Sequence, residues 1–178
     1  MNEGLIARRY AMAMLKVAQK LDAAKDVYEQ LKLFEQNYIA HPDLHKALLN
    51  PILSPRDKES LLTTAIGIEN SELYTRGIRL LIANHREMYV RSICLMYQHL
   101  YRKKYNIGRV KIVSASPLDK LTLERIKKMV ADCEFRELEY VEQIDPSLVG
   151  GFILQINSKQ LDCSVSRELR ELMRQLVQ

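Results

Sequence analysis

Residues 5–21 read LIARRYAMAMLKVAQKL and decide how the first half of the chain folds. The strongly polar side chains of this stretch are Arg8, Arg9, Lys16, Gln19 and Lys20. At ~100° per residue they fall within an arc of about 120°. The apolar side chains spread over about 200°, which is wider than the apolar stripe of ~100° on an ordinary surface helix. The stretch therefore predicts a helix that is covered on more than one side.

Five further helices are expected before residue 106, each with start or stop signals of its own. Ser54 before Pro55 is a strong N-cap, and Ser71 is a second one. His41 and Asn50 each precede a proline, where helices usually end. The expected helices cover residues 26–39, 43–49, 54–66, 71–84 and 87–105. With 5–21 they predict a six-helix bundle.

The helices at 5–21, 71–84 and 87–105 are apolar over more of their circumference than a surface helix needs. They are either all central in the bundle, or they leave one groove open for an amphipathic helix of a partner. In a bundle of only six short helices, three can hardly all be fully buried, which favours the groove. Three alanines on the first helix and a glycine on the fifth would let a partner approach closely. These small residues are Ala7, Ala11, Ala18 and Gly77.

The second half mixes strands and helices. Alternating patterns predict strands at 109–115, 138–144 and 152–156, and helical spacing predicts a helix over 118–133. Residues 157–160 are expected to form a tight turn, and Ser164 is expected to cap a closing helix. The apolar stripe of that helix comprises Val165, Leu169, Leu172, Met173 and Leu176. The order β-α-β-β-α indicates a small sheet with helices on one face.

Composition and charge change near residue 105. The chain has 178 residues with 47% hydrophobic and 28% charged side chains, which excludes disorder. Residues 1–105 hold 16 Lys+Arg and 11 Asp+Glu, whereas residues 106–178 hold 11 of each. Eight of the nine tyrosines precede residue 106. We therefore expect an α+β protein, with the six-helix bundle over 1–105 and the β-α-β-β-α domain over 106–178.

No arrangement of residues indicates catalysis, a metal or a cofactor. Cys94, Cys133 and Cys163 are too widely spaced for a zinc site and are expected to pack as small hydrophobes in a reducing compartment. Gly150 and Gly151 stand between a turn and a strand, whereas a phosphate-binding loop precedes a helix. They are more typical of a bulge or of a positive φ angle.

Membrane insertion and export are not expected. The apolar N-terminal stretch is interrupted by basic residues, and no segment is long and apolar enough for a membrane span or a signal peptide.

Several separated motifs, taken together, resemble one known family. Residues 7–13 read ARRYAMA and resemble its "ARxYAxA" start, Asn50-Pro51 with Lys58 resembles "NPxxxxxxK", and residues 80–86 are similar to "LLxxNxR". Residues 113–118, 145–151 and 162–169 resemble its landmarks in the second half. The family is the delta subunit of bacterial ATP synthase, whose mitochondrial relative is the oligomycin-sensitivity-conferring protein. The chain departs from it at Ser166, where the family commonly has arginine, and at Met14, where a small residue is usual.

The resemblance implies a non-catalytic stator subunit that couples rotation to ATP synthesis. It implies that the bundle binds the N-terminal helix of an alpha subunit and that the second domain binds subunit b of the peripheral stalk. The groove between the first and fifth helices would be lined by Ala7, Tyr10, Ala11, Met14, Gly77, Leu80, Leu81 and Asn84. The structural motif of the second domain would comprise Asp145, Gly150, Gly151, Asp162 and Ser164. The implied location is peripheral, on the cytoplasmic face of the bacterial inner membrane.

A basic two-domain module that binds nucleic acid is the alternative. The net charge is +5, and Arg102, Lys103 and Lys104 lie between Tyr101 and Tyr105. Cations in the last turn of a helix are more commonly a solvated C-terminus. Because the charge excess is small and unclustered, the protein-binding reading is favoured over nucleic acid.

Overall fold

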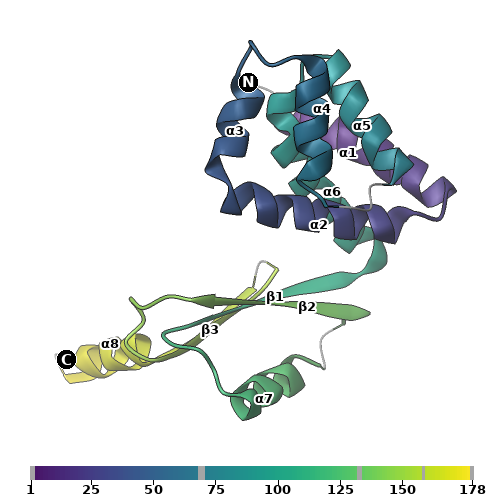
Figure 1. Ribbon diagram of the computed structural model, residues 1–178. Coiled ribbons are helices and arrows are strands. Elements are labelled where there is room, and N and C mark those ends of the chain that lie inside the picture. The colour runs from purple at the N-terminus through teal and green to yellow at the C-terminus, as the bar shows by residue number, and fades with distance from the viewer. Residues whose placement is uncertain (1–2, 68–70, 132–133, 158, 177–178) are drawn as a thin grey trace. The chain divides into compact units, whose positions relative to one another are not determined.

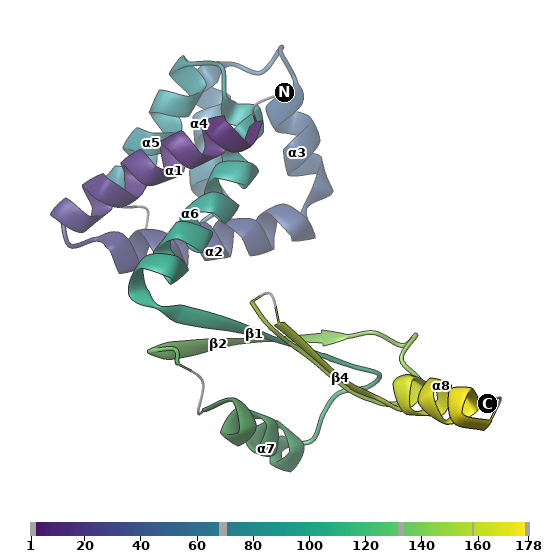
Figure 2. The same cartoon turned by 180° about the vertical axis from the view of Figure 1, so that it is seen from behind.

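The computed structural model describes residues 3–67, 71–131, 134–157 and 159–176 (Figure 1 and Figure 2). The chain divides into two compact units, Met1–Lys104 and Tyr105–Gln178. The first unit is helical and the second combines helices with a sheet, so the predicted α+β class is confirmed. Of the three cysteines, Cys94 is buried and Cys163 is half-buried, whereas Cys133 lies outside the described residues.

The first unit contains six α-helices and one short 3-10 helix among its described residues. These elements are α1 (Glu3–Lys20), α2 (Ala24–Ala40), α3 (Pro42–Leu49), α4 (Pro55–Thr64), α5 (Glu72–Ala83), η1 (Glu87–Tyr89) and α6 (Val90–Tyr105).

Ser54 and Ser71 are the N-caps of α4 and α5, as predicted. Ser54 Oγ accepts a hydrogen bond from Asp57 N at 3.2 Å, and Pro55 occupies the first turn of α4. Ser71 Oγ accepts one from Tyr74 N at 3.2 Å at the start of α5. Each cap satisfies an amide that has no partner within its own helix.

Aromatic side chains from α2, α5 and α6 form much of the core of the first unit. Tyr28, Phe34, Tyr74 and Tyr97 are almost completely buried. The Tyr74 hydroxyl donates to the Leu62 carbonyl at 3.0 Å, and the Tyr97 hydroxyl donates to the Ala24 carbonyl at 3.1 Å. These bonds satisfy buried polar groups and join α5 to α4 and α6 to α2.

One residue, Asn106, joins α6 to the first strand of the second unit. It has a φ of 54°, in the left-handed region that asparagine tolerates better than most residues. Its side-chain Nδ2 donates to the Glu134 carbonyl at 2.9 Å, and its own carbonyl accepts from Arg136 N at 3.0 Å. The connection is therefore short and is held by hydrogen bonds to the second unit.

The described part of the second unit contains a mixed four-stranded sheet and two helices. Its elements are β1 (Ile107–Ser114), α7 (Lys120–Ala131), β2 (Glu137–Ile144), β3 (Gly151–Ile156), β4 (Lys159–Ser164) and α8 (Val165–Leu176). The strand order is β2-β1-β3-β4, with β1 parallel to β2 and antiparallel to β3. The helix α7 packs on the sheet, where Ile126 and Val130 join Val110, Ile112 and Leu154 in a buried cluster.

The predicted β-α-β-β-α order is wrong, because β4 is a fourth strand. Lys159 and Gln160, expected in a turn, pair with Ile156 and Gln155 of β3. Asn157 has a φ of 52°, which is typical of a two-residue hairpin turn. The chain therefore reverses before Lys159, whereas the prediction extended the turn to residue 160. Residues 159–164 lack the β-branched side chains that usually mark a strand, so the pattern concealed it.

The prediction that both helices cover one face of the sheet is also wrong for α8. Ser164 caps this helix as expected, since its Oγ accepts from Arg167 N at 3.3 Å. The apolar stripe, however, is not covered by the described residues. The exposed fractions are 39% for Val165, 50% for Leu169, 55% for Leu172 and 65% for Met173.

Candidate functional site

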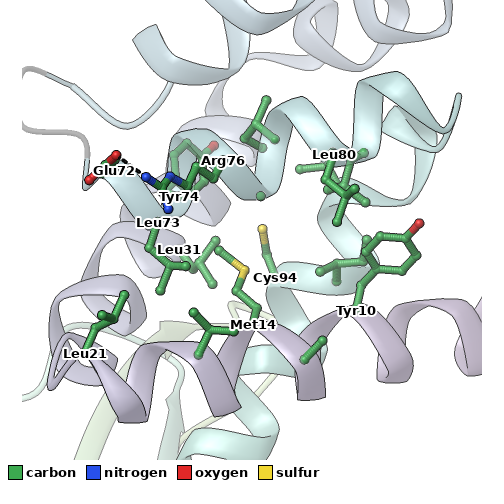
Figure 3. Close-up of a pocket in the computed structure, with 17 residues that line it drawn as sticks. Tyr10, Met14, Leu21, Leu31, Glu72, Leu73, Tyr74, Arg76, Leu80 and Cys94 are labelled. Atoms are coloured by element: carbon green, nitrogen blue, oxygen red, sulfur yellow. Dashed lines mark hydrogen bonds and ion pairs between the residues drawn. The ribbon is translucent and has the colours of Figure 1, made fainter.

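An apolar groove lies between α1 and α5 on the first unit (Figure 3). It has a volume of about 330 Å³. Its walls are formed by Tyr10, Ala13, Met14 and Val17 from α1, by Leu21 just beyond the end of α1, and by Leu73, Arg76, Gly77 and Leu80 from α5.

The spacing along both helices gives the groove its length. Tyr10, Ala13 and Val17 recur at three or four residues, so they share one face of α1. Leu21 follows the last residue of the helix and continues this face, since its N donates to the Val17 carbonyl at 3.2 Å. From Tyr10 to its last residue, Lys20, the helix rises about 15 Å at 1.5 Å per residue. Figure 3 shows Tyr10 and Leu80 at one end, with Leu21, Leu73 and Glu72 toward the other. The groove is long enough for about three turns of a helix.

Gly77 lies in the middle of the α5 wall and keeps the groove deep. A Cβ at this position would lie 3.3 Å from the terminal Cε of Met14 across the groove. The rim beside it is apolar and open, since Val17 is 43%, Leu21 62% and Leu80 55% exposed. Exposed apolar side chains gathered around a groove mark a surface that binds another apolar group.

The floor of the groove carries no charge. Leu31, Ile78, Leu81, Val90 and Ile93 are all buried beneath it. Burial raises the pKa of the Tyr74 hydroxyl and that of the Cys94 thiol, so both stay protonated. The floor therefore offers apolar contact and no site for an ionic reaction.

The two ends of the groove differ in charge. At the Leu73 end, Arg76 Nη2 lies 2.6 Å from Glu72 Oε1, so the two charges offset each other. At the Tyr10 end, Arg86 Nη1 donates to the Tyr10 hydroxyl at 3.3 Å, and its guanidinium lies over the Tyr10 ring at 5.5 Å. The guanidinium of Arg9 is 6.0 Å from the same ring. The Tyr10 end is therefore cationic.

The structure brings together five of the eight residues proposed for the groove. They are Tyr10, Met14, Gly77, Leu80 and Leu81. The other three lie elsewhere: Ala7 and Ala11 are 1% and 0% exposed in the core, and Asn84 caps α5 by donating to the Leu80 carbonyl at 2.7 Å. Ala18 is likewise completely buried. The small residues of α1 therefore admit neighbouring helices of its own unit, and the prediction that they open the groove is wrong.

Ala13, Val17, Leu21 and Leu73 were not among the predicted groove residues. The first three follow Tyr10 at the same helical spacing, so they extend its face along α1 and one residue beyond its end. The wide apolar arc of α1 contains two stripes: Ala7, Ala11 and Ala18 face the core, and Tyr10, Ala13 and Val17 face the groove. Counting in steps of three or four residues from Tyr10 distinguishes the second stripe from the first.

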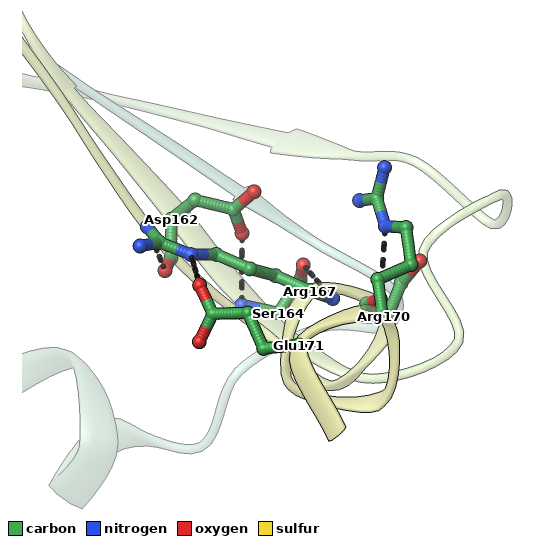
Figure 4. A network of polar contacts seen from close by, with 6 residues as sticks. Asp162, Ser164, Arg167, Arg170 and Glu171 are labelled. Atoms are coloured by element: carbon green, nitrogen blue, oxygen red, sulfur yellow. Dashed lines mark hydrogen bonds and ion pairs between the residues drawn. The ribbon is translucent and has the colours of Figure 1, made fainter. Parts of the chain in front are cut away.

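A second set of predicted residues surrounds the start of α8 (Figure 4). Asp162 Oδ1 accepts from Ser164 N at 2.9 Å, and hydrogen bonds from Ser164 hold the pKa of Asp162 below its usual value. Arg167 Nε lies 2.9 Å from Glu171 Oε1, and its Nη1 donates to the Asp162 carbonyl at 3.4 Å. These contacts fix the direction in which α8 leaves β4.

Gly150 and Gly151 lie against the same junction. The Gly150 carbonyl accepts from Val165 N at 3.1 Å. Gly151 has a φ of 76°, and a Cβ there would lie 2.2 Å from the Cys163 carbonyl oxygen. The prediction of a positive φ is confirmed at Gly151. Asp145, by contrast, holds the turn after β2 by accepting from Ser147 N at 3.0 Å.

One of the cations weighed for nucleic-acid binding makes a contact within the bundle. Arg102 Nη1 donates to the Tyr28 hydroxyl at 3.1 Å, so this cation helps to hold α6 on α2. The described residues contain no group of three or more His, Cys, Asp or Glu side chains placed to hold a metal ion. Among the described helices, none combines the length and the apolar character that crossing a membrane requires.

Comparisons with known proteins identify the family of the chain. The sequence profile of the family described as "ATP synthase delta (OSCP) subunit" matches residues 6–176. The chain is similar to ATP synthase subunit delta of Bacteroides thetaiotaomicron, with 36% identity over 99% of this chain and 96% of that protein. It is 29% identical to the delta subunit of Desulfitobacterium hafniense, over 99% of this chain and 98% of that one.

A solved structure has the same fold. A chain of the mitochondrial ATP synthase hexamer of Toxoplasma gondii superposes with a TM-score of 0.73 at 21% identity, and the match covers 100% of this chain and 98% of that one.

An apolar groove bordered by exposed apolar side chains is a feature of proteins that bind other proteins. The chain belongs to the ATP synthase delta (OSCP) subunit family. It is accordingly a non-catalytic subunit of ATP synthase, with its place in the peripheral stalk.

Proposed function

We propose that this protein joins the catalytic head of a bacterial ATP synthase to subunit b, so that the head does not turn with the rotor. The six-helix bundle of residues 1–105 binds the N-terminal helix of an alpha subunit. The domain of residues 106–178 binds subunit b. The complex would hold the protein at the cytoplasmic face of the inner membrane.

The open apolar groove is the observation that carries the first half of this proposal. An amphipathic helix binds such a groove with apolar side chains at positions i, i+3 or i+4, and i+7. The groove is about three turns long and has an uncharged floor, which suits one stripe of that kind. The affinity would come from burial of apolar surface, at about 25 cal/mol per Å² before the cost of association.

Calorimetric titration with a synthetic peptide of the alpha-subunit N-terminus tests this half. We expect one peptide to bind per protein, with a negative heat-capacity change because apolar surface is buried. Raising the salt concentration should weaken binding only a few-fold. If the peptide does not bind, and single-stranded RNA or DNA binds with an affinity that falls steeply as salt is added, the protein is instead a basic two-domain module that binds nucleic acid.

The uncovered stripe of α8 supports the second half. Four of its apolar side chains are between 39% and 65% exposed, although they lie on one face of a well-anchored helix. Exposure of this apolar surface to water is unfavourable, and a partner helix that covers the stripe would remove it from water. A helix of subunit b would pack against it as one helix packs against another.

Leu172→Asp should weaken the binding of a C-terminal segment of subunit b by at least about tenfold, because a carboxylate would be desolvated in the interface. Since Leu172 is 55% exposed, the variant should keep the thermal stability of the unmodified protein. Surface plasmon resonance with immobilised subunit b measures the affinity. Arg174→Gln makes the same change in net charge on the other side of α8 and is the control. Equal affinities of Leu172→Asp and the unmodified protein would contradict a role for the stripe.

Two interfaces on one chain would reinforce each other. Once one partner is bound, the other end of the complex is held at a high effective concentration, so two modest affinities give a tight connection. This arrangement suits a stalk that must stay attached under the torque of rotation.

A further inference from the structure

Arg86 is a half-buried cation that contacts Tyr10 at one end of the groove, and it has no carboxylate partner among the described residues. Its contacts at the groove are with Tyr10, through the hydroxyl at 3.3 Å and the face of the ring at 5.5 Å. Burying part of a charge without an opposite charge lowers stability. The neighbouring Arg9 places a second positive charge 6.0 Å from the same ring.

Four other cations of the first unit are matched with carboxylates. These pairs are Lys46 with Asp43, Lys58 with Glu87, Arg76 with Glu72, and Arg79 with Glu59. One of them, Arg76, lies at the opposite end of the groove and is therefore already offset. Among the described residues beside the groove, the cations without a carboxylate partner are thus those next to Tyr10.

We infer that the helix bound in this groove places an acidic side chain against Arg86 and Tyr10. This inference rests on the proposed function, because it specifies the chemistry of the partner of that groove. The apolar stripe of the partner supplies affinity, and the acidic side chain fixes which end of the partner lies over Tyr10. Arg86 is a specificity-determining residue of the groove.

The geometry at Tyr10 suits a carboxylate. The cation–π contact and the tyrosine hydroxyl hold the guanidinium in place before the partner arrives, so little side-chain entropy remains to be lost. An arriving carboxylate can accept from the guanidinium and from the hydroxyl of Tyr10. A charge-assisted hydrogen bond at the edge of an apolar interface is stronger than one in open water.

A double-mutant cycle between the protein and a peptide of the alpha-subunit N-terminus tests the inference. Arg86→Gln should weaken binding about tenfold, which corresponds to about 1.4 kcal/mol. Each acidic residue of the peptide is replaced in turn by its amide. One of these replacements should weaken binding to the unmodified protein by a similar factor and have less than about a twofold effect on Arg86→Gln.

Two further variants separate recognition from structure. Lys16→Gln removes one charge from the exposed surface of α1, outside the groove, and should leave the affinity unchanged. Tyr10→Phe keeps the ring under Arg86 but removes the hydroxyl, and it should retain the coupling between Arg86 and the peptide. If Arg86 served only to position Tyr10, Arg86→Gln would weaken every peptide equally.

The outcomes distinguish this inference from the proposed function. Peptide binding that is insensitive to Arg86→Gln, or that couples to none of the acidic residues, would overturn the inference and leave the groove assignment in place. A peptide that does not bind the unmodified protein at all would overturn both.

Discussion

Gly77→Leu is expected to abolish binding of the alpha-subunit peptide, with a loss of at least about 100-fold in affinity. Gly77 is in the centre of the α5 wall, and a Cβ there already lies 3.3 Å from Met14 Cε. The rest of a leucine side chain would occupy the space that the proposed partner helix needs. Calorimetric titration at a fixed temperature measures the loss.

Gly77→Ala is the matched control for this substitution. Its single methyl group meets only the flexible end of Met14, so the peptide should still bind within a few-fold of the original affinity. Both variants remove a glycine from the interior of a helix, which should raise the free energy of unfolding by up to about 1 kcal/mol. A stable Gly77→Leu protein that binds the peptide normally would show that the partner does not enter the groove.

Lys58→Met is expected to lower the free energy of unfolding of the first unit by about 3 kcal/mol at neutral pH, because it leaves a buried carboxylate unpaired. Lys58 Nζ lies 2.5 Å from Glu87 Oε1, and the two side chains are only 10% and 12% exposed. The pair joins α4 to η1. Glu87 Oε2 is buried without a hydrogen-bond partner among the described residues, so Lys58 supplies the contact that keeps this carboxylate charged.

Denaturant unfolding of the full chain, followed by near-UV circular dichroism, measures this effect. Eight of the nine tyrosines precede residue 106 and the chain has no tryptophan, so the signal reports mainly on the first unit. Lys58→Met combined with Glu87→Leu should recover most of the loss, since it replaces the pair with apolar side chains. A single variant as stable as the original protein would contradict this account of the pair.

The pH dependence provides an independent check. Burial alone would raise the pKa of Glu87, but the hydrogen bond and charge of Lys58 hold it below its usual value. In the original protein this stabilisation is present above the unfolded pKa and is lost as the pH falls through the lower folded pKa. In Lys58→Met the burial raises the pKa, so the penalty is relieved on acidification. The difference between the two proteins should therefore shrink as the pH falls below 5.

The helices of the first unit could be predicted because their ends carry local signals. Ser54 and Ser71 cap α4 and α5 with their own side chains, and Pro55 fits only the first turn of a helix. Such interactions lie within a few residues of one another, so one sequence is enough to find them. Gly77 could also be assigned to the groove from the sequence, because its position along α5 determines which face of the helix it occupies.

The remaining errors concern contacts between distant parts of the chain. Ala7 and Ala11 are small, as a helix-binding surface requires, yet the same property lets neighbouring helices of their own unit bury them. Residues 159–164 form β4 because β3 offers an edge, although their side chains do not favour a strand. The apolar stripe of α8 predicts burial, but within this chain nothing described covers it. In each case the outcome depends on which other segment packs against the residues, and the local sequence pattern does not determine that segment.

The connection at Asn106 has a mechanical consequence for a peripheral stalk. A linker of many residues behaves as a soft entropic spring, and it would stretch at each step of the rotor before any load passed through it. One residue between α6 and β1 supplies only two soft backbone dihedrals, and hydrogen bonds to Glu134 and Arg136 restrain them. In the proposed stalk, any load that passes between α6 and β1 would therefore act on this single residue, which is itself hydrogen-bonded to the second unit.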